Sequence, residues 1–315
     1  MEHAQEIQRK AISAAHVQHG VRPELVPGQP PINEVPGEAA ARAGIRASFA
    51  DVPALFEPFT MMPDPASFDS LINGVNQAMK TLSLGRDTDD PISGDVYYAN
   101  RLLSLIGASE AYLESWNGGA ADRFRSEFIN TFPALVTNQF INCAVLSNAL
   151  RAQQKMWVNA RTDIDKIAHD TLNALDNMDH CGQNTWTMTF TVIASVAAVA
   201  AVPISAGTSL AALTVATTVT AVGAASQVVA AHQLDPEKET TYHGETAEVV
   251  IEQTRRAVME TLSQIRSSEQ KIAGALAAAS AAMDRNPELF VAPRPRLADA
   301  VAGDVLSREQ LGNRR

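Results

Sequence analysis

The chain has 315 residues, and its 35 acidic and 25 basic side chains give a formal net charge of −10. This excess of negative charge argues against a nucleic-acid-binding protein, which needs a basic face, and against simple electrostatic attachment to an anionic membrane. Hydrophobic residues make up 46% of the chain but aromatic residues only 5%. The apolar content is mostly Ala, Val, Leu and Ile at spacings of three and four, which predicts an all-α fold.

The N-terminal segment, residues 1–64, is predicted to be a helix followed by a proline-rich linker. Residues 2–19 place Ala11 and Ala15 on one face of a helix. Five prolines between 20 and 36 then exclude a continuing helix. The first residues carry neither a basic stretch nor an apolar core, so we expect no Sec-type signal peptide.

Residues 65–285 are predicted to form an elongated helical bundle. Heptad-like apolar spacing holds over 134–179 and again over 246–283, so each segment predicts one long helix. The apolar seams of these helices must be buried against each other or against partners. Residues 286–315 carry three prolines and mixed charges and predict a flexible tail. The expected seams include Val136, Cys143, Leu146, Ala160, Ile167 and Thr171 in the first helix and Ile251, Val258, Ile265 and Ile272 in the second.

The most informative motif is W-N-G-G-A-A-D-R-F, which runs from Trp116 to Phe124. Apolar residues at helical spacing precede it, and phenylalanines follow Phe124 at intervals of four. A tight turn between two amphipathic segments predicts a helical hairpin over 97–132.

The residues of this turn suit a hairpin. Asn-Gly tolerates positive φ, so Gly118 is expected to reverse the chain. Ala120 and Ala121 have small side chains that let the second helix start close to the first. Trp116 is large enough to wedge between the two helix ends and fix their angle.

This motif resembles the signature of the WXG100 superfamily, the small helical-hairpin proteins exported by type VII (ESX) secretion systems of actinobacteria and firmicutes. The order of a W-x-G hairpin, a long helix, an uncharged segment and a further helix is similar to larger ESX secretion-associated proteins of the EspA and EspE kind. The resemblance implies a protein that is exported through a type VII system and acts in the cell envelope or outside the cell.

The same resemblance implies a small WXG100-like helical partner, with self-association as the other possibility. The type VII export signal is Y-x-x-x-[D/E], and none of the four tyrosines has an acidic residue four positions later. We therefore expect a partner to carry the signal, unless the chain is not itself exported.

From His180 to Leu234 the chain contains no Asp, Glu, Lys or Arg. Two apolar stretches, 186–202 and 208–231, are separated by a predicted reversal, and each is near the ~20 residues of a membrane-spanning helix. Ala, Thr and Ser dominate, which weakens the case for insertion and also fits a hairpin packed inside a bundle. Both readings stay open, as does a protein that folds first and inserts later. In this apolar hairpin, 186–231, the residues that we expect to contact either the membrane or the bundle are Trp186, Phe190, Pro203, Gly207 and Gly223.

No catalytic motif is present: the sequence lacks a P-loop, G-x-G-x-x-G, H-E-x-x-H and G-x-S-x-G. Cys143 and Cys181 are too few for a disulfide framework and lack the spacing of a zinc site. A solvated helix face is predicted around Asp163 and Asp165, which lie close to basic residues in the sequence. The adjacent pair His169-Asp170 is also expected at the surface or at a helix end. We expect no catalytic residue, no cofactor and no metal site.

These features leave three classes of function. The favoured one is a non-enzymatic substrate or component of a type VII secretion system that works by helix–helix association. The alternative is a membrane-inserting protein, similar to helical pore-forming toxins, that uses the 186–231 hairpin. A toxin-delivery module is the third, and it is weakened because no catalytic domain follows Met283.

Overall fold

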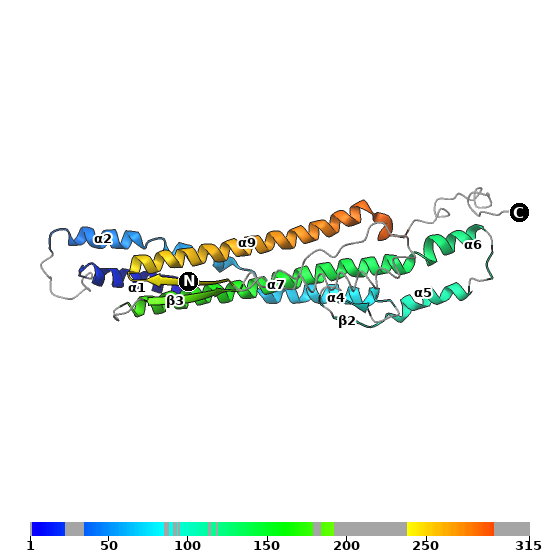
Figure 1. Ribbon diagram of the computed structural model, residues 1–315, viewed down its shortest axis with the longest axis horizontal. Coiled ribbons are helices and arrows are strands. Elements are labelled where there is room, and N and C mark those ends of the chain that lie inside the picture. The colour runs from blue at the N-terminus through cyan, green and yellow to red at the C-terminus, as the bar shows by residue number, and fades with distance from the viewer. Residues whose placement is uncertain are drawn as a thin grey trace. The chain divides into compact units, whose positions relative to one another are not determined.

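The computed structural model is mostly helical, as predicted from the spacing of the apolar residues (Figure 1). The two longest helices are α7 (Phe132–Asp176) and α9 (Ala247–Arg285), in the two segments with heptad-like spacing. The structure describes residues 2–22, 35–84, 88–90, 93, 95–112, 115–117, 119–178, 184–191 and 238–292.

The chain divides into two compact units, each assembled from three segments. The N-terminal segment groups with later parts of α7 and early parts of α9, so this division differs from the predicted ranges 1–64 and 65–285. Unit 1 contains Met1–Pro65, Gln154–Val196 and Leu234–Gln270, and unit 2 contains Ala66–Gln153, Ala197–Gln233 and Lys271–Arg315.

Unit 1 begins with α1 (Glu2–Gln18), α2 (Glu38–Ser48) and α3 (Val52–Phe56), followed by the 3-10 helix η1 (Glu57–Met61). The α1 helix contacts both α2 and α3. It does so through small and branched side chains spaced three or four apart, which put one buried stripe on its inner face. The fully buried members of that stripe are Ala4, Ile7, Ala11 and Ala15.

The core of unit 1 forms where α7 and α9 pack with these N-terminal helices. Met156 and Ile167 of α7 and Val250 and Ile251 of α9 belong to one buried cluster. Each such side chain contributes about 1.5–3 kcal/mol to folding. The hydroxyl of Thr171 lies 2.9 Å from that of Thr254 on α9, so the two helices also share a buried polar contact.

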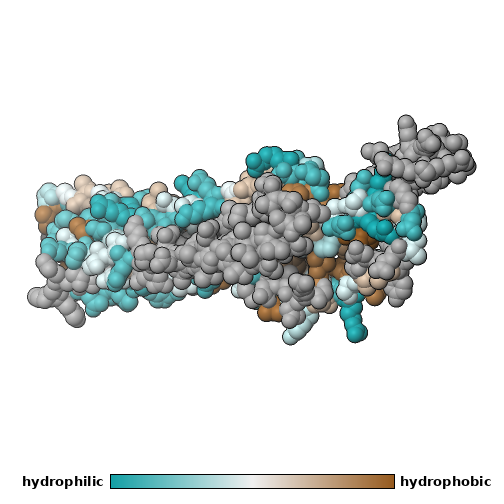
Figure 2. Space-filling view, turned by 45° about the vertical axis from the view of Figure 1, so that its right-hand side comes forward, coloured by the Kyte–Doolittle hydropathy of each residue, from teal (hydrophilic) through white to brown (hydrophobic). Residues whose placement is uncertain are grey.

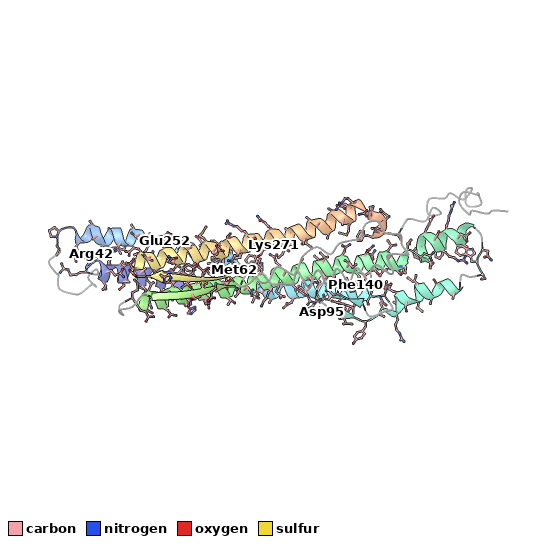
Figure 3. All side chains as sticks on the ribbon, viewed as in Figure 1. Arg42, Met62, Asp95, Phe140, Glu252 and Lys271 are labelled. Atoms are coloured by element: carbon pink, nitrogen blue, oxygen red, sulfur yellow. The ribbon has the colours of Figure 1, made fainter. Side chains whose placement is uncertain are left out.

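The charged surface of unit 1 holds the N-terminal helices through specific pairs. Arg255 of α9 binds the carboxylate of Asp51 through Nη2 at 2.7 Å and Nε at 3.0 Å. The Arg255 guanidinium lowers the pKa of Asp51. Arg42, labelled on α2 in Figure 3, is buried and donates from Nη1 to the carbonyl oxygen of Arg22.

Unit 1 also contains an antiparallel pair of strands, β3 (Asn184–Phe190) and β4 (Lys238–Gly244), with Trp186 opposite Tyr242. The all-α prediction was wrong here, because residues 186–190 form a strand and not the start of an apolar helix. The sequence T-W-T-M-T-F alternates threonine with large apolar residues, a period-2 pattern that favours a strand. Phe190 is fully buried as a result.

Unit 2 begins with the short 3-10 helix η2 (Pro65–Phe68), α4 (Asp69–Leu82), and the short strand pair β1 (Thr88–Asp89) and β2 (Val96–Tyr97). It continues through α5 (Arg101–Tyr112), α6 (Gly119–Phe124) and the π-helical turn η3 (Arg125–Ile129), and ends with the short 3-10 helix η6 (Pro287–Leu289).

One buried cluster of unit 2 consists of Met79, Tyr97, Phe140 and Ala144. The rings of Tyr97 and Phe140 meet edge to face with centroids 5.5 Å apart (Phe140 is labelled in Figure 3). Polar contacts close its edges, since Asn138 donates to the carbonyl oxygen of Leu289 at 2.8 Å.

The predicted seams are buried in part. Ile167 and Thr171 of α7 and Ile251 and Val258 of α9 are buried as expected. Leu146, expected in the α7 seam, is 41% exposed, while Phe140 and Ala144 are buried instead. Val136 and Ala160 of the predicted α7 seam are buried on either side of Leu146, so the stripe stays largely on the buried face of this 45-residue helix.

Candidate functional site

The W-x-G motif lies between α5 and α6 in unit 2. Helix α5 ends at Tyr112 and α6 begins at Gly119, and α5 contacts η3, which follows α6 directly. Gly118 lies outside the described residues. Ala120 lies in α6, and Ala121 is fully buried.

Trp116 is 42% exposed, so it is not buried between two helix ends. Its ring lies 5.7 Å from that of Phe124, which is itself 37% exposed. The rings continue along the chain: Phe124 stacks on Phe128 at 5.3 Å, and Phe128 lies 5.8 Å from Phe132. The i, i+4 spacing therefore builds a continuous aromatic row and not separate core residues.

Helix α5 carries exposed apolar side chains of its own. Leu102 and Leu105 are 71% and 63% exposed and lie three residues apart on one helix face. Figure 2 shows brown surface in the part of the molecule where Figure 1 labels α5 and α6. We call Leu102, Leu105, Trp116, Phe124 and Phe128 the hairpin surface.

Arg125 connects the two sides of the turn. Its Nη2 donates to the carbonyl oxygen of Trp116 at 2.7 Å, and its Nη1 lies 3.9 Å from Asp122. The guanidinium thereby satisfies a backbone acceptor in the segment between α5 and α6. The role of Arg125 was not predicted from the sequence, where the available signal was a basic side chain nine positions after the tryptophan.

The predicted apolar hairpin begins inside the folded part of unit 1. The backbone N–H of Thr191 donates to Asp163 at 3.0 Å, its hydroxyl donates to the same carboxylate at 2.7 Å, and Asn159 donates to its carbonyl oxygen at 2.7 Å. Asp163 is buried, so its assignment to a solvated face was wrong. The buried carboxylate is satisfied by the two hydrogen bonds that it accepts from Thr191, at the end of β3.

This arrangement affects the first predicted membrane stretch, because strand β3 takes up its residues 186–190. Residues 192–202 of that stretch lie outside the described residues. Pro203, Gly207 and Gly223 lie outside the described residues. Within the part of the chain that the structure describes, no helix is both long enough and apolar enough to cross a membrane.

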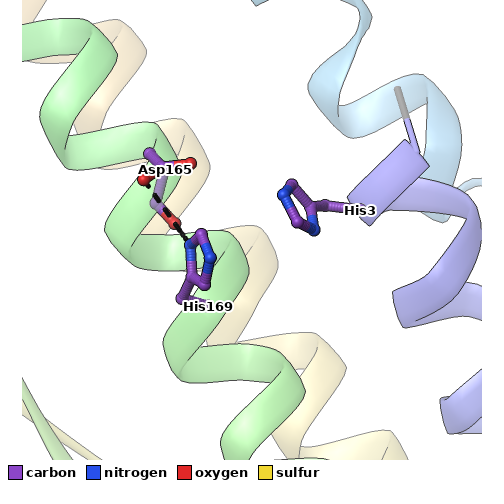
Figure 4. A group of neighbouring side chains, drawn as sticks. All are labelled: His3, Asp165 and His169. Carbon is purple, nitrogen blue, oxygen red and sulfur yellow. Dashed lines mark hydrogen bonds and ion pairs between the residues drawn. The ribbon is translucent and has the colours of Figure 1, made fainter.

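Three chemically active side chains come together elsewhere on unit 1. His3 of α1 lies beside Asp165 and His169 of α7, and one ligand atom from each lies within 4.8 Å of the others (Figure 4). All three side chains are exposed. This cluster was not predicted from the sequence, because His3 is far from the other two residues along the chain.

Cys143 does not resemble a reactive thiol. Burial raises the pKa of its thiol, which lowers the fraction of nucleophilic thiolate at neutral pH. The nearby side chains of Phe140 and Ala144 are apolar and supply no general base.

No protein-family model, curated protein or solved structure matches this chain.

Proposed function

We propose that this protein is a non-enzymatic helical substrate or component of a type VII (ESX) secretion system. It acts by helix–helix association in the cell envelope or outside the cell. The observation that carries this proposal is the hairpin surface. It combines the aromatic row at the W-x-G motif, in which Trp116 and Phe124 are exposed and Phe128 is half-buried, with the two exposed leucines of α5.

The hairpin surface has the character of a helix-binding face. Monomeric proteins rarely expose contiguous large apolar side chains unless a partner covers them. Leu102 and Leu105 on α5 and the row that continues from Trp116 to Phe128 offer anchors at helical spacing. Every 100 Å² of apolar area that a partner covers contributes about 2.5 kcal/mol before the costs of association.

In this proposal α5, α6 and η3 form the W-x-G helical hairpin, and the partner is a small WXG100-like helical protein that supplies the export signal. Trp116 and Phe124 contact the partner directly, and Arg125 holds the turn so that the tryptophan keeps its position. Self-association through the same surface is the other arrangement that this chemistry allows.

The experiment is fractionation of the native cells into cytosol, membrane, wall and medium. The chain is followed in the parent strain and in a strain without the ESX ATPase. We expect the wall and medium fractions to contain the chain only in the parent. Equal amounts in both strains would rule out type VII export, and ATPase-independent accumulation in membranes would favour the membrane-inserting alternative.

Two variants connect export to the hairpin surface. Trp116→Ala and Phe124→Ala should reduce the exported fraction about tenfold while the total amount of protein stays constant. Tyr98→Ala is the matched control, because Tyr98 is an exposed aromatic residue of unit 2 outside the hairpin surface. If Tyr98→Ala lowers export as much as Trp116→Ala, the hairpin surface has no specific role.

A further inference from the structure

We propose that His3, Asp165 and His169 form a binding site for a divalent transition-metal ion of the zinc type, and that this ion joins the first turn of α1 to α7. Two imidazoles and one carboxylate are a donor set that zinc prefers. The site is independent of the hairpin surface, because all three residues belong to unit 1.

The backbone brings the three donors together by register. His3 and Lys10 are seven residues apart on α1, and His169 and Asp176 are seven residues apart on α7. Lys10 Nζ binds Asp176 Oδ1 at 2.6 Å, so this pair fixes how α1 lies along α7. Seven residues are close to two helical turns, so the same register places His3 beside His169.

The side chains of the cluster face one another. The rings of His3 and His169 have centroids 4.9 Å apart, and Figure 4 shows His3 directed from α1 toward α7. Asp165 lies one turn before His169 on the same face, since residues four apart on a helix are neighbours. Two ligands come from one helix and the third from another, so a bound ion would bridge the two elements.

The hydrogen bond of His169 prepares its ring for metal binding. Nδ1 lies 2.9 Å from the backbone carbonyl oxygen of Asp165. The same Nδ1 lies 3.5 Å from Oδ2 of Asp165. A carbonyl oxygen only accepts, so in the neutral ring Nδ1 carries the hydrogen and Nε2 offers the lone pair. Metal-bound histidines are commonly oriented by this kind of hydrogen bond to a carbonyl oxygen.

The geometry needs only a small adjustment to close around an ion. Ligand atoms sit about 2.0–2.2 Å from zinc, so two of them around a tetrahedral ion lie roughly 3.3 Å apart. One ligand atom of each residue now lies within 4.8 Å of the others, and the side chains are exposed and able to change rotamer. Three protein ligands leave the fourth zinc position to water or to a group from another molecule.

Charge around the cluster favours a cation. Asp170 follows His169 directly and interacts electrostatically with both His169 and Lys166. Asp165 and Asp170 together outweigh Lys166, which leaves a negative balance on this stretch of α7. Imidazole ligands disfavour Mg²⁺ and Ca²⁺, which prefer oxygen donors.

The test is calorimetric titration of Zn²⁺ into the full-length chain, with any purification tag removed and the protein first treated with chelator. We expect saturable binding of one ion, unchanged by millimolar Mg²⁺. His3→Gln and His169→Gln should each weaken Zn²⁺ binding about tenfold or more. Asp165→Asn should weaken it in the same direction.

The matched control is His19→Gln, which removes another exposed histidine of unit 1 that lies 3.0 Å from a carboxylate, that of Glu248. This variant should bind Zn²⁺ like the wild type. Melting curves in chelator check that every variant is folded, and Zn²⁺ should raise the melting temperature of the wild type and His19→Gln alone. If His3→Gln and His169→Gln bind Zn²⁺ as tightly as the wild type, or the wild type binds none, the proposal is wrong.

Discussion

Helices α1 and α5 both carry apolar residues at helical spacing, but these residues are buried in α1 and exposed in α5. In α1 the stripe that includes Ile7 and Ala11 is fully buried within unit 1. In α5, Leu102 and Leu105 remain mostly exposed. Buried apolar residues such as those of α1 stabilise the fold, whereas the exposed ones of α5 are, in our proposal, free to contact a partner. The spacing of apolar residues in the sequence is helical in both segments and does not distinguish the two cases.

The largest effect on stability is expected from Ile7→Ala. This change removes buried methyl and methylene groups and leaves a cavity, which costs about 2–5 kcal/mol of unfolding free energy. Leu102→Ala, on the exposed face of α5, should change it by about 0.5 kcal/mol or less. Urea unfolding followed by circular dichroism measures both, and equal losses would remove the distinction between the two helices.

Asp163→Ala should give the second largest loss of stability. It removes the acceptor for the Thr191 N–H and hydroxyl groups, and an unsatisfied buried donor costs about 1–3 kcal/mol. Asp165→Ala is the control in chelator-containing buffer, because it removes an exposed acid from the same helix. An Asp163→Ala variant that unfolds like this control would show that Thr191 is not held by the carboxylate.

Trp116→Ala is expected to have a small effect on stability despite the size of the side chain. A fully buried tryptophan would cost about 3–5 kcal/mol on truncation, but Trp116 is 42% exposed and we expect a loss below ~1.5 kcal/mol. Its effect should appear in export instead. A loss of several kcal/mol in the isolated chain would mean that the tryptophan is a core residue.

The smallest effect concerns pH. Hydrogen bonds from Arg22 lower the pKa of Glu38 from 4.5 to about 2. A carboxyl whose pKa is lower in the folded state stabilises the fold above its unfolded pKa, and this stabilisation is lost as pH falls from about 4.5 toward 2. Glu38→Gln should flatten the pH dependence of unfolding in that window. Identical profiles for variant and wild type would show that the pair with Arg22 does not form.

Sequence periodicity was sufficient for the helices that carry a regular stripe of apolar residues. The predicted segment 2–19 corresponds to α1, and the heptad-like segments 134–179 and 246–283 correspond to α7 and α9. Helix α2 was missed, because its sequence E-A-A-A-R-A-G-I-R-A-S contains few large apolar residues and follows a proline-rich stretch.

Contacts between residues that are far apart along the chain could not be predicted from the sequence. Strand β3 pairs with β4, whose first residue is Lys238, and neither strand shows where its partner lies along the chain. The burial of Asp163 depends on Thr191, and the proximity of His3 to His169 depends on the packing of α1 along α7. The exposure of Trp116 also depends on tertiary packing, so the W-x-G motif alone suggested a wedge where the structure has a surface residue.

The most direct test of the central claim is hydrogen–deuterium exchange on the chain in two states, purified alone and isolated from native cells with whatever is bound. We predict that a bound partner slows hydrogen–deuterium exchange in α5 and α6. The exchange of α1, whose apolar stripe is already buried, should stay unchanged. Identical exchange of α5 and α6 in the two states would contradict the claim that the hairpin surface is a site of helix–helix association.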